Sequence, residues 1–218
     1  MKIAVDGPAG AGKSTLARAL AQKLGFIYID TGAMYRALTW KALQMGIDLQ
    51  DGASLQGLAA SLDIHFETQA GIQRLICAGE DITELVRTPE VNAAVSVVAS
   101  FPAVREIMVS KQQRMARNSS VVMDGRDIGE LVLPDAEFKF FLTASLEERA
   151  RRRALEMERR GFDNDFNNTK KDIEKRDRLD AERELGALKI LPDSIVIDTG
   201  RHSAEDILAR ILTIIGED

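Results

Sequence analysis

Short apolar runs of strand length recur along the chain and alternate with longer segments of helical periodicity. The runs lack regular polar alternation, which is typical of strands buried on both faces of a parallel sheet. They are KIAVD (2–6), FIYID (26–30), SVVMD (120–124), FKFFLTA (138–144) and SIVID (194–198). Helical spacing is found over 13–24, 33–45, 145–160, 167–184 and 203–215. This alternation predicts an α/β fold with a parallel sheet between helices, whose ligands bind at the carboxyl ends of the strands.

One region departs from this alternation. DIHFET (63–68) alternates in strand fashion, QAG (69–71) is a candidate turn, and IQRLICAGEDI (72–82) continues in extended style. The pattern predicts a small antiparallel insertion between the second and third core strands. Residues 88–117 have helical character and are interrupted at Pro102, which predicts two helices.

The segment IAVDGPAGAGKST, which starts at residue 3, has the spacing G-x-x-x-x-G-K-S between a strand and a helix. Its glycines allow backbone conformations that side chains would obstruct, so that N–H groups form an anion-binding nest at the helix N-terminus. Lys13 is then placed against the β- and γ-phosphates, and Ser14 offers a hydroxyl to Mg²⁺. The loop predicts binding of a nucleoside triphosphate.

The loop does not define the reaction, and other nucleotide-binding classes fit less well. A switch GTPase should carry D-x-x-G and [NT]-K-x-D. TKKD (169–172) matches the second string, but polar residues precede it and D-x-x-G is absent from the chain. A motor or helicase would need a longer chain and a more elaborate hydrolytic apparatus. The sequence therefore favours a small phosphotransferase.

Transfer to a phosphate acceptor needs positive charge and alignment rather than a general base, and arginine binds phosphate with two parallel N–H groups. Arg36 lies in DTGAMYR, after the second strand. Its position allows two interpretations, a phosphate-binding arginine or an ordinary surface arginine. Arg126 and Asp127 lie in MDGRDIG, after the third strand. In the same motif Asp124 stands at the Walker B position, where a carboxylate organises Mg²⁺.

Two further groups of charges follow. Arg176, Asp180 and Arg183 are spaced i, i+4, i+7 on one helical face, which alone is more typical of a solvated face with local salt bridges. The run RARRRALEMERR (149–160) is basic, but its arginines cannot all face one ligand. Interleaved glutamates and the lack of nearby aromatic residues disfavour RNA binding there.

Length, charge and cysteine content argue against several other classes of protein. The 218 residues suffice for one sizeable core, and a net charge of −5 gives no basic field that would favour nucleic acid. The single cysteine, Cys77, excludes an internal disulfide and favours a reducing compartment, and with His65 and His202 it has no metal-ligand spacing. No signal peptide and no apolar stretch near the roughly 20 residues of a membrane span are evident, so we expect a cytoplasmic protein without a membrane partner.

The motifs DGPAGAGKST, DTGAMYR, SFPAVR, DGRDIG and RD-x-x-D-x-x-R occur in this order, and together they resemble the bacterial cytidylate kinase family. The resemblance implies a five-stranded parallel sheet, an antiparallel nucleoside monophosphate-binding insertion and a helical lid. It also implies transfer of the γ-phosphate of ATP to CMP or dCMP with Mg²⁺, by a monomer that binds no nucleic acid. The implied parts are a core (about 1–57, 93–148 and 187–218), the insertion (about 58–92) and the lid (about 149–186).

The resemblance also assigns roles to individual residues. It implies that Lys13, Arg126 and Arg183 are catalytic, and that Ser14 and Asp124 hold the metal. ATP is expected to contact Gly7, Pro8, Ala9, Gly10, Ala11, Gly12, Lys13, Ser14, Thr15, Arg153 and Arg159. Arg36, Arg126 and Arg183 would grip the acceptor phosphate, and Arg176 and Asp180 would contact the ribose. Ser96, Arg105 and Asp127 would read the cytosine edge, and Thr31 would bond the phosphate or the base.

Two rival functions stay open on the sequence. One is a kinase of another small acceptor on the same core, such as another nucleotide or shikimate, against which DTGAMYR and the insertion argue. The other is a regulatory or RNA-associated protein that hydrolyses ATP slowly, for which the run at 149–160 is the support. The two classes differ in whether ATP turnover requires an added monophosphate.

Overall fold

The computed structural model describes residues 1–69, 72–163 and 165–216 of the chain, which divide into two compact units. The first unit comprises Met1–Tyr28 and Ala116–Asp218, and the second comprises Ile29–Met115.

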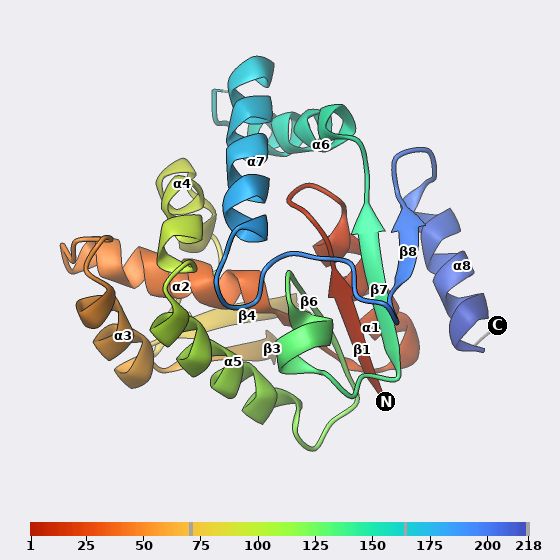
Figure 1. The fold of residues 1–218 in the computed structure, drawn as a ribbon, viewed down its shortest axis with the longest axis horizontal. Coiled ribbons are helices and arrows are strands. Elements are labelled where there is room, and N and C mark those ends of the chain that lie inside the picture. Colours follow the sequence, from red (N-terminus) through yellow and green to blue (C-terminus); the bar gives the residue numbers. More distant parts are fainter. Residues whose placement is uncertain (70–71, 164, 217–218) are drawn as a thin grey trace. The chain divides into compact units, whose positions relative to one another are not determined.

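The predicted α/β architecture is confirmed (Figure 1). A five-stranded sheet has the order β2-β6-β1-β7-β8. Its strands are β1 (Lys2–Asp6), β2 (Ile27–Asp30), β6 (Val121–Gly125), β7 (Phe138–Thr143) and β8 (Ile195–Asp198). Strand β1 pairs in parallel with β6 and β7, and β7 pairs in parallel with β8. Every apolar run predicted as a core strand therefore lies in this sheet.

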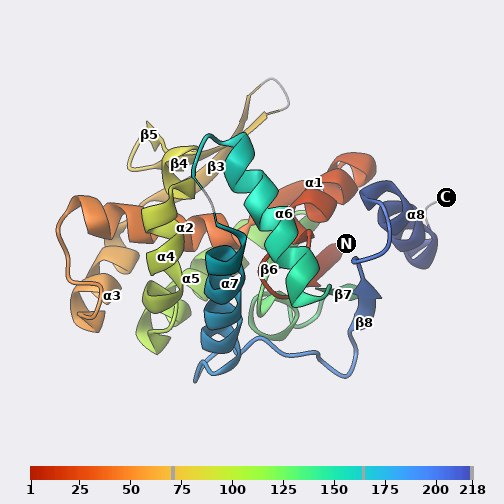
Figure 2. The same cartoon turned by 90° about the horizontal axis from the view of Figure 1, so that it is seen from above.

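The helices of the first unit are α1 (Lys13–Leu24), α6 (Leu146–Arg159), α7 (Phe166–Ala181) and α8 (Ala204–Ile215). Helices α1 and α8 pack on the sheet in one apolar cluster, to which all five strands of the sheet also contribute. Its largest members are Ile3, Leu16, Leu20, Tyr28, Phe140, Leu142, Ile197, Ile207 and Ile211. Helices α6 and α7 lie side by side in both views (Figures 1 and 2).

The prediction of one helix over 167–184 is wrong at its C-terminal end. Helix α7 stops at Ala181, because the carbonyl of Asp180 accepts a hydrogen bond from the amide of Leu188 (2.8 Å) in place of the next helical amide. Arg183 therefore lies in the turn after the helix and not on its face.

The second unit contains α2 (Thr31–Gln44), α3 (Gly52–Ser61), the short 3₁₀ turn η1 (Leu85–Arg87), α4 (Pro89–Val98) and α5 (Pro102–Ala116). The last two helices confirm the predicted interruption before Pro102. Its core includes the buried side chains of Leu55, Leu75, Ile82, Val95 and Met108.

The predicted antiparallel insertion is a three-stranded sheet in the same unit. It consists of β3 (Ile64–Gln69), β4 (Ile72–Cys77) and β5 (Glu80–Asp81), visible in Figure 2. Strands β3 and β4 pair antiparallel from Ile64 opposite Cys77. The turn expected at QAG includes residues 70–71, which lie outside the described part of the chain.

Helix α3 was not predicted from the sequence. Asp51 caps its N-terminus by accepting from the amides of Ala53 and Ser54 (both 3.1 Å), and Leu55 and Leu58 face the core. Its glycines, Gly52 and Gly57, weaken the helical signal. The aspartate before a leucine pair at helical spacing is the signal that marks it.

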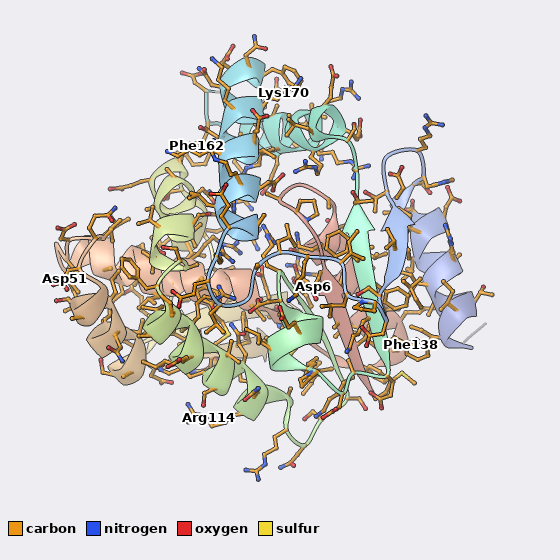
Figure 3. The ribbon with its side chains drawn as sticks, viewed as in Figure 1. Asp6, Asp51, Arg114, Phe138, Phe162 and Lys170 are labelled. Carbon is orange, nitrogen blue, oxygen red and sulfur yellow. The ribbon has the colours of Figure 1, made fainter. Side chains whose placement is uncertain are left out.

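Asp6, at the carboxyl end of β1 (Figure 3), connects the sheet to the segment after β6. Its carboxylate accepts from the amides of Ile128 (2.9 Å) and Gly129 (2.8 Å), which begin a single π-helical turn, η2 (Ile128–Val132). Burial raises the pKa of Asp6 to about 6, and the two amide bonds and Lys13 oppose this only in part.

We expect this pKa to give the folding free energy a defined pH dependence. A carboxyl group with a raised pKa in the folded state binds its proton more tightly there than in the unfolded state. Asp6 therefore makes its full contribution to the stability of the fold below its ordinary pKa of 3.8, and this contribution is lost as the pH rises through about 6. The loss corresponds to about 3 kcal/mol. A ¹³C NMR titration of the Asp6 carboxyl carbon, identified by its disappearance in Asp6→Asn, should give a midpoint near 6. A midpoint at or below 4 would contradict the prediction.

Candidate active site

The phosphate loop lies between β1 and α1, as its sequence predicts. Gly7, Gly10 and Gly12 have φ angles of 146°, 76° and 83°. A Cβ atom at Gly7 would lie 2.1 Å from the carbonyl oxygen of Leu142, so the loop passes against β7 too closely for any side chain. Helix α1 begins after Gly12 without a side-chain cap in the described structure. Its first amides are thus arranged to receive an anion.

Lys13 is buried at the start of α1, and its Nζ donates to the carbonyl oxygen of Pro8 (2.7 Å). Burial, followed by the positive charge of Arg126 and of Arg176, lowers the pKa of Lys13 well below its ordinary value. Asp124 and Asp180 act in the opposite direction. The lysine thus stands in a strongly positive environment, where bound phosphates would stabilise its charge.

Ser14 and Asp124, the residues expected to hold the metal, lie together. Ser14 Oγ donates to Asp124 Oδ2 (2.8 Å), and the other carboxylate oxygen accepts from the hydroxyl of Tyr28 (2.7 Å). Tyr28 is buried on β2, and the guanidinium of Arg18 lies 5.4 Å from the centre of its ring. Sequence reasoning missed Tyr28, because its position within an apolar strand gives no sign that its hydroxyl contacts a residue 96 positions away.

Three arginines expected at the acceptor phosphate and ribose surround Asp180. Arg126 Nε donates to Asp180 Oδ2 (2.7 Å), and Arg183 donates to Oδ1. Burial would raise the pKa of this carboxyl, which is 1% exposed, but Arg126, Arg183 and Arg176 together hold it below its ordinary value. Burial would lower the pKa of Arg126, but Asp180 raises it. These charges form one cluster around the buried carboxylate of Asp180, beside Lys13, and not the solvated face that the spacing alone suggests.

Asp127 follows Arg126 just after the carboxyl end of β6. It is buried, and its charge contributes to the raised pKa of Asp6. The segment DGRDIG therefore places one arginine in the Asp180 cluster and turns into η2, where Asp6 holds it.

The second unit holds another part of the expected acceptor site. Asp30 caps α2 by accepting from the amide of Ala33 (2.7 Å), and its other oxygen receives Arg36 Nη2 (3.1 Å). Thr31, the first residue of α2, is buried. The helical spacing in DTGAMYR thus brings Arg36 back to Asp30 at the end of β2.

Two of the three residues expected to read the base, Ser96 and Arg105, also lie in this unit. Arg105 is 1% exposed, and its guanidinium donates to the carbonyl of Ala99 (3.1 Å) and lies 5.5 Å from the ring centre of Tyr35. Ser96 Oγ on α4 is buried and has no hydrogen-bond partner among the described residues. A buried hydroxyl without a partner is costly and is consistent with a place for a ligand.

The basic run on α6 divides into buried and solvated arginines. Arg149 is buried against the phosphate loop and donates to the carbonyl of Ala9 (3.1 Å), and Arg152 donates to Thr199 Oγ1 (3.0 Å) and O (2.6 Å). Thr199 Oγ1 lies 3.1 Å from the carbonyl oxygen of Ala11. Sequence reasoning assigned neither arginine to the loop.

The two lid arginines expected at ATP have other surroundings. Arg153 donates to Glu156 (2.8 Å), and Arg159 is exposed. The string TKKD lies inside α7, and Lys170 is at the outer end of that helix (Figure 3), so it does not form a guanine-binding loop after a strand.

Two further features were sought among the described residues: a cluster of metal ligands, and a helix that could cross a membrane by itself. No three His, Cys, Asp or Glu side chains in the described part gather as metal ligands. None of the described helices is by itself long and apolar enough to cross a membrane, although α4 and α5 together have such a length and composition across a bend of 103°.

Solved structures resemble this fold. An uncharacterized protein from Eubacterium ventriosum matches with a TM-score of 0.54 and 15% identity, over 100% of this chain and 99% of its own. A shikimate kinase from Bacteroides thetaiotaomicron matches with a TM-score of 0.50 and 14% identity, over 99% of this chain and 98% of its own. At these identities the similarity shows the fold alone.

Sequence comparison identifies the family. A cytidylate kinase from a Geobacillus species is 50% identical over 100% of this chain and 97% of its own length. Another cytidylate kinase, from Shouchella clausii, is 51% identical over 99% of this chain and 96% of its own length. The model of the cytidylate kinase family matches residues 3–217. The chain therefore belongs to the cytidylate kinase family of phosphotransferases.

Proposed function

We propose that this chain transfers the γ-phosphate of ATP to CMP and to dCMP, giving ADP and CDP or dCDP, in pyrimidine nucleotide metabolism. Family membership supports the general reaction, which is phosphorylation of CMP with ATP. The observation that carries the proposal is the phosphate loop with buried Lys13, beside the cluster of Arg126, Arg183 and Asp180. Use of dCMP, Mg²⁺ as the metal and the roles of single residues are the finer parts of the proposal.

On the donor side, the phosphates of ATP lie on the loop from Gly7 to Thr15. Its left-handed glycines turn amides toward the anion, and the uncapped start of α1 adds a positive dipole end. Lys13 leaves the carbonyl of Pro8 and binds the β- and γ-phosphates. Arg153 and Arg159 remain our candidates for the lid side of ATP, where they would exchange their present surroundings for the nucleotide when the lid closes.

Ser14 and Asp124 fit a magnesium ion that arrives with the nucleotide. A hydroxyl and a carboxylate are the hard oxygen donors that Mg²⁺ prefers, so Ser14 and Asp124 would hold the ion together with oxygens that the protein does not supply. This agrees with the lack of a larger acidic cluster among the described residues. When bound, Mg²⁺ would neutralise charge on the transferring phosphate. The protein's own contribution is to orient the two donors, which Tyr28 does by fixing Asp124.

The arginines supply what the transfer needs from the acceptor side. A phosphate acceptor is already an anion, so it must be held against the repulsion of a second anion rather than deprotonated. Arg126 and Arg183 act on the acceptor phosphate with Arg36, and Asp180 fixes the first two. Arg176 and Asp180 bind the ribose, where Asp180 accepts from the 2′-hydroxyl.

Asp127, Arg105 and Ser96 complement the cytosine edge. Cytosine presents an amine donor beside ring acceptors, which suits a carboxylate with an arginine and a hydroxyl. Uracil has a carbonyl in place of the amine, so Asp127 would face an acceptor. A buried group left unpaired costs about 1–3 kcal/mol, which corresponds to a preference of roughly ten- to a hundredfold. Thr31 provides a further hydroxyl for the phosphate or the base.

We further propose that the enzyme is a cytoplasmic monomer without nucleic-acid or membrane partners. The working division is a core (about 1–57, 93–148 and 187–218), an acceptor-binding insertion (about 58–92) and a lid (about 149–186). Closure of the lid would exclude water, which competes with CMP for the γ-phosphate.

The acceptor and the base-reading role are tested together. ADP production from ATP and Mg²⁺ should be strong with CMP and dCMP and weak with UMP, AMP, GMP and shikimate. In Asp127→Ala the preference for CMP over UMP should fall at least tenfold, because the carboxylate that accepts from the cytosine amine is lost. Asp135→Ala, which changes an exposed aspartate in the same unit, is the matched control. ADP production that is independent of any acceptor would contradict the kinase proposal.

Tyr28→Phe tests the orientation of Asp124. The ring stays buried while Asp124 loses one of its two hydroxyl donors, which is worth about 1 kcal/mol. We expect the Mg²⁺ concentration for half-maximal activity to rise about fivefold. ATP binding measured in EDTA should stay unchanged. An unaltered Mg²⁺ requirement would show that Tyr28 does not support the metal site.

A further inference from the structure

Ala9, in the middle of the phosphate loop, has both of its backbone groups held by side chains distant in sequence. Its amide donates to Asp177 Oδ1 (3.2 Å), and its carbonyl accepts from Arg149 Nη1 (3.1 Å). Arg149 also donates to the other oxygen of Asp177 and, through Nε, to the carbonyl of Ala144 (3.0 Å). We call Arg149 and Asp177 the Ala9 clamp.

The clamp lies against the loop rather than in solvent. The side chain of Arg149 is 9% exposed and that of Asp177 is 20% exposed. A Cβ atom at Gly10 would lie 2.9 Å from the backbone oxygen of Arg149 and 3.0 Å from its Cβ. A buried guanidinium is costly unless it is fully paired, and Arg149 uses its donors on two carbonyls and one carboxylate.

The clamp determines the direction of the next amide. In a trans peptide the C=O and N–H groups point to opposite sides. The carbonyl of Pro8 faces Lys13, and the amide of Ala9 in the same peptide faces Asp177. In the following peptide the carbonyl of Ala9 faces Arg149, so the amide of Gly10 is turned to the side where Lys13 lies. That is the side on which the phosphates bind under the proposed function.

We propose that Arg149 and Asp177 are positioning residues, which fix the peptides around Ala9 so that the Gly10 amide is directed at the phosphates before ATP arrives. Neither residue contacts the nucleotide in this role. A loop held in its binding conformation avoids the ordering cost that a free glycine-rich loop incurs on association. The clamp spans α6 and α7, so it also links the two lid helices to the donor site. The inference rests on the proposed function only in taking ATP as the ligand of the loop.

The test is the affinity for AMP-PNP with Mg²⁺, measured by calorimetry without CMP. Arg149→Met and Asp177→Ala should each weaken binding about tenfold, because each leaves one backbone group of Ala9 unpaired and frees the peptide to rotate. Affinity for CMP should stay within about twofold. The double variant should bind only about twofold more weakly than either single variant, because both side chains act on one residue. Arg151→Met on α6 and Asp172→Ala on α7 are matched controls at exposed positions.

A second readout separates positioning from a merely structural role. Hydrogen exchange of the Ala9 amide should be faster in Asp177→Ala, and Asp177→Asn, which keeps an acceptor oxygen, should restore part of both the protection and the AMP-PNP affinity. Unchanged AMP-PNP affinity in both single variants would overturn the proposal. So would a parallel fall of AMP-PNP affinity, CMP affinity and melting temperature that Asp177→Asn does not relieve.

These outcomes are independent of the acceptor. A wild-type protein that binds AMP-PNP but does not phosphorylate CMP would contradict the proposed function and leave the clamp testable by the same titrations. A wild-type protein that phosphorylates CMP, with clamp variants of unchanged AMP-PNP affinity, would contradict the clamp alone.

Discussion

Lys13, Arg126 and Arg176 place positive charge close together at the carboxyl edge of the central sheet, and their repulsion has to be balanced within the protein before any phosphate is bound. Two carboxylates provide the balance. Asp180 is shared between Arg126 and Arg183, and Asp124 lies near enough to Lys13 to oppose the fall in its pKa. The pKa of Lys13 stays well below its ordinary value, first because the lysine is buried and then because Arg126 and Arg176 repel its charge. A polyanion would therefore gain more from this edge than any single ion pair supplies, which is the electrostatic basis for bringing two phosphorylated substrates together.

Aspartates at or next to the carboxyl ends of strands show how one residue type acquires different tasks. Asp6 accepts two amides and holds η2, Asp30 caps α2 and receives Arg36, and Asp124 receives two hydroxyls. Asp198 accepts the amide of Gly200 (2.8 Å) in the turn after β8. Only the partners distinguish them. An aspartate that faces amides satisfies fixed backbone donors, whereas the hydroxyls that face Asp124 can rotate their hydrogens away and leave its oxygens to a metal ion.

The parts of the fold and site that follow from the sequence are those encoded locally. Apolar runs of strand length, the glycine spacing of the phosphate loop and the break at Pro102 each depend on neighbouring residues, and the structure has them where they were expected. Helix α3 was missed because its composition hides a short amphipathic face. Tyr28 and Asp177 were missed for another reason, since they act on residues 96 and 168 positions away. No local pattern distinguishes such a side chain from a core tyrosine or a solvated helical aspartate.

The basic run of α6 shows that a local pattern of charge also does not reveal which residues those charges contact. Counted along the sequence, its arginines resemble a surface for an anionic polymer, but the structure assigns them internal partners. Arg149 and Arg152 bond to backbone groups beside the phosphate loop, and Arg151 and Arg153 pair with glutamates of their own helix. A polyanion bound to this helix would have to replace those contacts, and for Arg149 it would have to expose a buried guanidinium. The charges of Arg149 and Arg152 are therefore directed toward the phosphate loop, whereas Arg151 and Arg159 face solvent.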